Sequence, residues 1–145
     1  MATDRHDADA ELLTAISLEQ TWCFDGAAAD VADARAGADG FLRQLTHMHP
    51  SATPDAYDDA LLVVTELASN AVAFAPGPFT LTLQALMTGS LHISLADANP
   101  IAPAARPADF TGQGGMGWHL VNTVADEVIV VTGGGGKTVH TFLPW

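Results

Sequence analysis

The segment from Thr53 to Phe74 constrains the fold of this chain more than any other stretch. Apolar side chains fall on nearly every side of a helix drawn over it, which predicts a helix that is largely buried. Pro54 suits the first helical position, and Pro76-Gly77-Pro78 cannot continue the helix. The chain has 145 residues, enough for one domain built around such a helix.

Two polar side chains interrupt this apolar helix. Glu66 and Asn70 are four residues apart, so they share one face within about one turn. A carboxylate and a carboxamide on a buried helix must be hydrogen-bonded, line a wet pocket or hold a cation. The alternative is an exposed stripe, or an internal hydrogen-bonded pair without a ligand.

Periodicity and turn residues predict the remaining elements. An acidic tail is expected at 1–18 and a single domain at 19–145. Within the domain we expect strands at 20–24, 79–86, 91–96, 127–132 and 138–143, and helices at about 28–47 and 118–125. This order predicts an α+β fold, a two-layer sandwich whose mixed, mostly antiparallel sheet is covered on one face by helices.

Asp97 lies at the end of an alternating strand. Leu91, Ile93 and Leu95 point to one face, and the alternation carries Asp97 onto that apolar face. An unpaired carboxylate there would cost several kcal/mol, so it needs a donor from a ligand or from the protein. Alternatively, Asp97 caps the turn that continues to Pro100.

Glycine-rich segments occur twice after this strand. The run 112–117 leads into an apolar helix, where backbone amides suit an anion. The passage from 98 to 117 is too long for a turn and is typical of a functional lid or of a disordered segment. The run Gly133 to Thr138 superficially resembles a phosphate-binding loop, but it precedes a strand and has the wrong spacing, so we reject that interpretation.

Composition limits the classes of partner. Seventeen acidic residues against five basic ones give a net charge of −12, which argues against nucleic acids and anionic membranes. One cysteine, Cys23, excludes an intramolecular disulfide, and no apolar run is long enough to span a membrane. The N-terminus lacks the residue order of a secretory signal, so we expect a cytoplasmic protein.

Four motifs occur in an order that resembles one known family. They are the run 66–75, Asp97 followed by prolines, the segment 115–121, and the segment 136–139. Together they resemble the GHKL or Bergerat-fold ATPases, and more narrowly the histidine-kinase-like domains of bacterial anti-sigma factors that act as serine kinases. The resemblance covers the chain from about residue 28 to its last residue.

The resemblance implies ATP and Mg²⁺ as ligands and assigns roles to the motif residues. Glu66 corresponds to the general base, and Asn70 to the asparagine that coordinates Mg²⁺. Asp97 corresponds to the acceptor for the adenine amino group, and Thr138 to the threonine that supports that contact. Gly115, Met116 and Gly117 belong to the lid that covers the phosphates.

The resemblance also implies a function. It implies a serine/threonine protein kinase that phosphorylates a small anti-anti-sigma (STAS-like) partner, with a sigma factor as a further partner and a homodimer as a common state. Met116 stands where that branch commonly has arginine, and Phe74 where histidine is common. These differences keep a nucleotide-binding interaction module with little or no kinase activity as an alternative. A third alternative is a protein without nucleotide, in which Glu66, Asn70 and Asp97 are structural.

Overall fold

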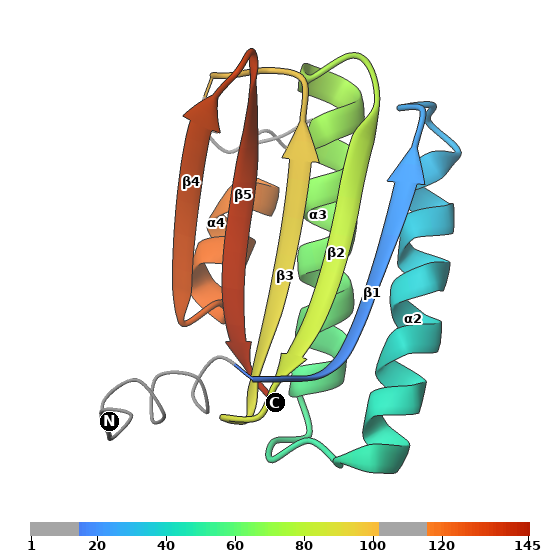
Figure 1. Cartoon of the computed structure of the whole chain (residues 1–145), viewed down its shortest axis with the longest axis vertical. Helices are drawn as coiled ribbons and strands as arrows, with labels where there is room; N and C mark the ends of the chain where they lie inside the picture. The colour runs from blue at the N-terminus through green and yellow to red at the C-terminus, as the bar shows by residue number, and fades with distance from the viewer. Residues whose placement is uncertain (1–14, 102–115) are drawn as a thin grey trace, which may run out of the picture.

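The computed structural model describes residues 15–101 and 116–145 and contains one five-stranded sheet. The strands are β1 (Ile16–Phe24), β2 (Phe79–Leu86), β3 (Ser90–Asp97), β4 (Glu127–Gly133) and β5 (Gly136–Pro144). The described helices are α2 (Asp30–Met48), α3 (Ala56–Phe74) and α4 (Met116–Val124). Figure 1 shows the three helices packed on the same side of the sheet. The predicted two-layer α+β sandwich is therefore confirmed.

The strand order in the sheet is β1-β2-β3-β5-β4, and every pairing is antiparallel. Two hairpins, β2–β3 and β4–β5, form from neighbouring segments of the chain. The pairing of β3 with β5 joins these hairpins and sets Asp97 opposite Lys137. Residues 40 positions apart in the sequence thus meet where β3 ends and β5 begins.

Alternation along the strands decides which side chains enter the core. In β2, Phe79, Leu81 and Leu83 are buried under the helices, and the residues between them are only partly buried. The same period holds in β3 and β5. Since one face of each strand packs on α2 and α3, apolar residues are required at every second position.

The structure begins some elements at other residues than the sequence predicts. α3 starts at Ala56, after Thr53, Pro54 and Asp55 have formed a turn. β1 starts at Ile16, so the last residues of the predicted tail 1–18 belong to the sheet, and residues 1–14 lie outside the described part of the chain. No helix in the described ranges has the length and hydropathy that a membrane span requires.

Candidate functional site

One stripe of α3 carries the polar residues singled out in the sequence. Glu66, Asn70 and Phe74 follow one another at four-residue intervals and therefore share one face of the helix. Glu66 and Asn70 are half-buried, whereas Val64 and Ala68, on the far side of the helix, are fully buried. The stripe extends about 12 Å along the helix axis.

Glu66 lies against the beginning of α4. A Cβ atom at Gly117, the second residue of α4, would overlap Oε2 of Glu66, so only glycine leaves room for the carboxylate there. Burial raises the pKa of Glu66 above its ordinary value. The structure thus brings Glu66 and Gly117 together, and burial gives the carboxyl group a stronger affinity for a proton.

Asp97 lies on the helix-facing side of β3, where the alternation predicts it. Its side chain is 4% exposed. One oxygen, Oδ1, accepts a hydrogen bond from the backbone N–H of Asn99 at 2.9 Å, so the local turn-capping alternative is present in the structure. The carboxylate has a second and stronger partner in the protein.

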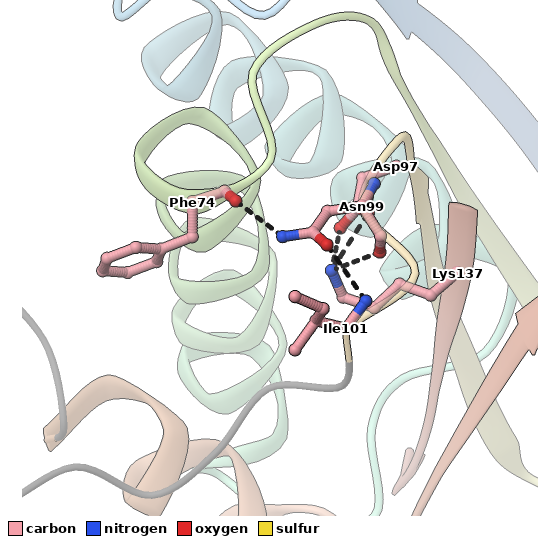
Figure 2. A network of polar contacts seen from close by, with 5 residues as sticks. All are labelled: Phe74, Asp97, Asn99, Ile101 and Lys137. Carbon is pink, nitrogen blue, oxygen red and sulfur yellow. Dashed lines mark hydrogen bonds and ion pairs between the residues drawn. The ribbon is translucent and has the colours of Figure 1, made fainter. Parts of the chain in front are cut away.

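That partner is Lys137, the only lysine of the sequence. Its Nζ lies 2.8 Å from Oδ2 and 3.0 Å from Oδ1 of Asp97, and it also donates to the carbonyl oxygen of Asn99 at 3.1 Å. Figure 2 shows Lys137 reaching from β5 into this cluster. Gly136 makes the approach of the strands possible, because a Cβ atom there would overlap the carbonyl oxygen of Asp97.

Asn99 connects this cluster to the end of α3. Its Nδ2 donates to the carbonyl oxygen of Phe74 at 2.9 Å, and its Oδ1 accepts from the N–H of Ile101 at 3.0 Å. The Phe74 ring points away from the cluster in Figure 2. The backbone at the C-terminal end of α3, rather than the Phe74 side chain, is therefore what Asn99 holds.

Thr138 is not brought together with Asp97. It pairs with Ala96, and alternation along β5 turns its side chain to the face of the sheet away from the helices. Lys137 occupies the helix-facing position beside Asp97 instead. The expectation that Thr138 supports a contact at Asp97 through its side chain thus needs correction: the residue that supports Asp97 is Lys137.

The structure describes only some of the residues predicted to form the lid. Gly115 lies outside the described residues, as do the glycines before it, and Met116 is described only as the first residue of α4. Within 15–101 and 116–145, no group of three or more histidine, cysteine, aspartate or glutamate side chains could hold a metal ion. The amide oxygen of Asn70 is a hard donor, and Mg²⁺ commonly takes only one or two protein ligands besides water and substrate phosphates.

The structure arranges these residues in two groups. Glu66, Asn70 and Gly117 lie along α3 and at the start of α4, and Asp97, Asn99 and Lys137 lie at the strand ends. The α3 stripe joins the groups, because Asn99 is hydrogen-bonded to its last residue. An elongated ligand could contact Asp97 at one end and Glu66 at the other.

Sequence reasoning missed Lys137 and Asn99. Lys137 entered the sequence-based interpretation only through the rejected phosphate loop and the segment 136–139. The alternation of Val139, Thr141 and Leu143 nevertheless extends back to it and predicts the core-facing side of a strand. That pattern identifies a buried lysine but not its partner.

The sequence Asp97-Ala98-Asn99-Pro100 indicates a turn that contains Asn99. The spacing of residues in the sequence does not predict the hydrogen bond from Asn99 to α3.

Comparison with known proteins supports the same fold. The family model of the histidine kinase-like ATPase domain matches residues 25–141. No curated protein sequence matches the chain significantly.

Two solved structures are similar in fold. The crystal structure of the RsbU and RsbW domains of Rv1364c from Mycobacterium tuberculosis aligns with a TM-score of 0.65 and 14% identity, over 88% of this chain and 32% of that one. A chain of the SiaB-SiaC complex from Pseudomonas aeruginosa aligns with a TM-score of 0.61 and 13% identity, over 96% of this chain and 95% of that one. At these identities the likeness shows the fold, and this chain spans about a third of the mycobacterial chain.

Proposed function

The chain belongs to the histidine kinase-like ATPase family, and from this premise we propose that it binds ATP with Mg²⁺. We further propose that it transfers the γ-phosphoryl group to a serine or threonine hydroxyl of a small partner protein. The observation that carries the proposal is the α3 stripe. It sets a half-buried carboxyl group, Glu66, about 12 Å along the helix from the end that meets the Asp97 cluster. A nucleotide can span that separation, with its base at one end and its γ-phosphate at the other.

The adenine base of ATP would contact Asp97. A carboxylate accepts hydrogen bonds and donates none when ionised, which suits the exocyclic amino group of adenine. The burial of Asp97 makes such a hydrogen bond effective, since water competes poorly for it. Replacing Asp97 by asparagine is expected to weaken ATP binding by about 1 to 3 kcal/mol.

The phosphates would lie between the start of α4 and Asn70. Backbone N–H groups at a helix N-terminus are suitable donors for an anion. The amide oxygen of Asn70 is a hard ligand that fits Mg²⁺. When bound, Mg²⁺ would neutralise charge on the triphosphate, which matters in a chain with a net charge of −12.

Glu66 would act as the general base. As the hydroxyl oxygen of the partner bonds to the γ-phosphorus, its proton passes to the Glu66 carboxylate, and the bond between that phosphorus and the bridging oxygen breaks to release ADP. Burial raises the pKa of Glu66, which strengthens it as a base. Gly117 keeps the carboxylate in place, because no side chain there displaces it.

The partner is proposed from the resemblance and from the structural neighbours. RsbW is a domain of one neighbour, and the other was solved as a complex of SiaB with SiaC. These support an anti-sigma-factor-like regulator that acts on a small anti-anti-sigma, STAS-like protein. A sigma factor as a second partner and a homodimer belong to the same proposal.

A second candidate function is an ATP-dependent interaction module with little or no phosphoryl transfer. One observation favours it: Lys137, the only lysine, is bound to Asp97 and Asn99 and does not serve the phosphates. Phosphoryl transfer depends on stabilising the charge of the transferring group, so the engagement of Lys137 elsewhere would slow it.

Calorimetry with ATP and Mg²⁺ tests the binding function. Micromolar binding is expected, and no binding by the wild-type protein would overturn both candidate functions. Transfer of a labelled γ-phosphoryl group to each STAS-like protein of the source organism, purified in turn, separates the two candidates. Glu66→Gln should bind ATP like the wild type and transfer at least about 100-fold more slowly. Glu19→Gln, an exposed change on β1, is the matched control.

A further inference from the structure

The ion pair between Lys137 and Asp97 has no role in the function proposed above. Both side chains are nearly buried, with 7% of Lys137 and 4% of Asp97 exposed. A buried ion pair is a poor source of stability, because desolvation of the two charges offsets their attraction. The pair lies at Asp97, the carboxylate proposed to contact adenine. This position suggests a role in ligand recognition rather than in stability.

Lys137 is bound within the protein. Its Nζ donates hydrogen bonds to Oδ1 of Asp97 and to the carbonyl oxygen of Asn99, and it forms an ion pair with Oδ2 of Asp97. Lys137 therefore acts within the protein, on the orientation and charge of Asp97. It does not extend the binding surface itself.

Asp97 retains capacity to accept. Oδ1 accepts hydrogen bonds from Nζ of Lys137 and from the N–H of Asn99. From the described residues Oδ2 has the ion-pair contact with Lys137 and no hydrogen bond, so it is the oxygen available to a ligand donor. An ionised carboxylate can only accept a hydrogen bond at that oxygen.

We propose that Lys137 is a positioning residue that holds Asp97 as an acceptor-only group and thereby selects purines with an exocyclic amino group over purines with a keto oxygen. The proposal rests on the nucleotide-binding function proposed above. A keto oxygen facing the ionised carboxylate would leave two acceptors together without a hydrogen between them. Without Lys137, the carboxylate loses its contacts with β5 and keeps only the hydrogen bond from the Asn99 N–H, so its orientation toward the base is less fixed and the discrimination weakens.

The test compares ATP with ITP, which carries the same triphosphate and ribose but has a keto oxygen in place of the amino group. Calorimetry should show a preference of wild-type protein for ATP on the order of 100-fold. Lys137→Met, which removes the charge and keeps an unbranched side chain, should reduce this ratio below about tenfold. Lys137→Arg should restore much of it. Thr141→Val, a buried polar change on the same face of β5, is the matched control and should leave the ratio unchanged.

Each outcome has a defined meaning. If Lys137→Met weakens or strengthens both nucleotides equally, Lys137 is only structural and the proposal is overturned, while the nucleotide-binding function stands. If wild-type protein binds neither nucleotide, the nucleotide-binding function itself fails. Should thermal melting show that Lys137→Met does not fold, the double variant Asp97→Asn, Lys137→Met removes both charges and should bind ATP and ITP about equally. A retained preference for ATP in the double variant would equally overturn the proposal.

Discussion

At the scale of single residues, Glu66 shows how a proposed catalytic group is set up by its neighbours. The carboxylate is half-buried and lies against Gly117, and the structure assigns it no salt bridge within the described residues. Burial favours its neutral form. A group kept in such a place at neutral pH reduces stability, which is typical of functional residues.

The pH dependence of stability follows from the raised pKa of Glu66. The folded state binds this proton more tightly than the unfolded state, so the contribution is most favourable below about pH 4.5 and is lost as the pH rises through the folded pKa. Glu66→Gln should therefore be more stable than wild type at pH 7, with the difference shrinking toward pH 4. Urea unfolding of both proteins at the two pH values checks this. A wild type that is the more stable at pH 7 would contradict it.

Gly117→Ala should separate activity from stability. The added Cβ displaces the end of a flexible Glu66 side chain, while alanine favours the helix by up to about 1 kcal/mol. We expect a Tm close to that of wild type and phosphoryl transfer reduced as in Glu66→Gln. Gly40→Ala on α2 is the control, since its Cβ would contact nothing within 4 Å. Undiminished transfer by Gly117→Ala would show that the Glu66 position does not matter.

At the scale of elements, the end of β3 is held to the end of α3 by one side chain. Asn99 bridges the carbonyl oxygen of Phe74 and the N–H of Ile101, and its own carbonyl oxygen accepts from Lys137. These contacts bring the two groups of site residues into one arrangement. They also order the chain directly before residues 102–115, where part of the predicted lid lies.

Asn99→Ala should loosen this junction. The two side-chain hydrogen bonds together contribute about 1 to 2 kcal/mol, so the free energy of unfolding should fall by that amount in urea. Amide exchange at residues 98–101 should become faster. Asn122→Ala serves as control, because Asn122 donates only to Trp118 one turn earlier in its own helix. Equal losses in the two variants would count against a role for Asn99 in the junction.

At the scale of the whole molecule, the net charge of −12 and a polyanionic ligand must be reconciled. Few cations are available, and Lys137 is bound within the protein. Binding of ATP should therefore depend on Mg²⁺ and on backbone amides rather than on basic side chains. This dependence distinguishes the protein from those that hold phosphates with clusters of lysine and arginine.

Ligand binding should stabilise the whole domain. With ATP and Mg²⁺ at 100 times Kd, the free energy of unfolding should rise by about 2.7 kcal/mol, because the ligand binds the folded state only. Thermal melting reports this as a higher Tm. Chelation of Mg²⁺ with EDTA should remove most of the increase. An equal increase with and without EDTA would show that the metal is not required.

Local periodicity determined much of this protein. The apolar helix ending at Phe74, the alternating strands and the buried position of Asp97 all follow from periods of 3.6 and 2 residues, which depend only on neighbouring positions. Glu66 and Asn70 were found in the same way. Strand and helix ends were less accurate, as at Ala56 and Ile16, because turns and strand pairing decide them.

The tertiary structure alone decided which residue meets Asp97. The sheet order places β5 beside β3, and the register sets Lys137 rather than Thr138 on the same face as the carboxylate. A shift of one residue in strand register moves every side chain of the strand to the other face of the sheet. A motif match that is uncertain by one position therefore cannot identify which residue contacts Asp97. The contact of Asn99 with α3 likewise joins segments whose spacing in the sequence carries no signal. Long-range pairing therefore supplied the Lys137–Asp97 ion pair on which the proposed selectivity for the base depends.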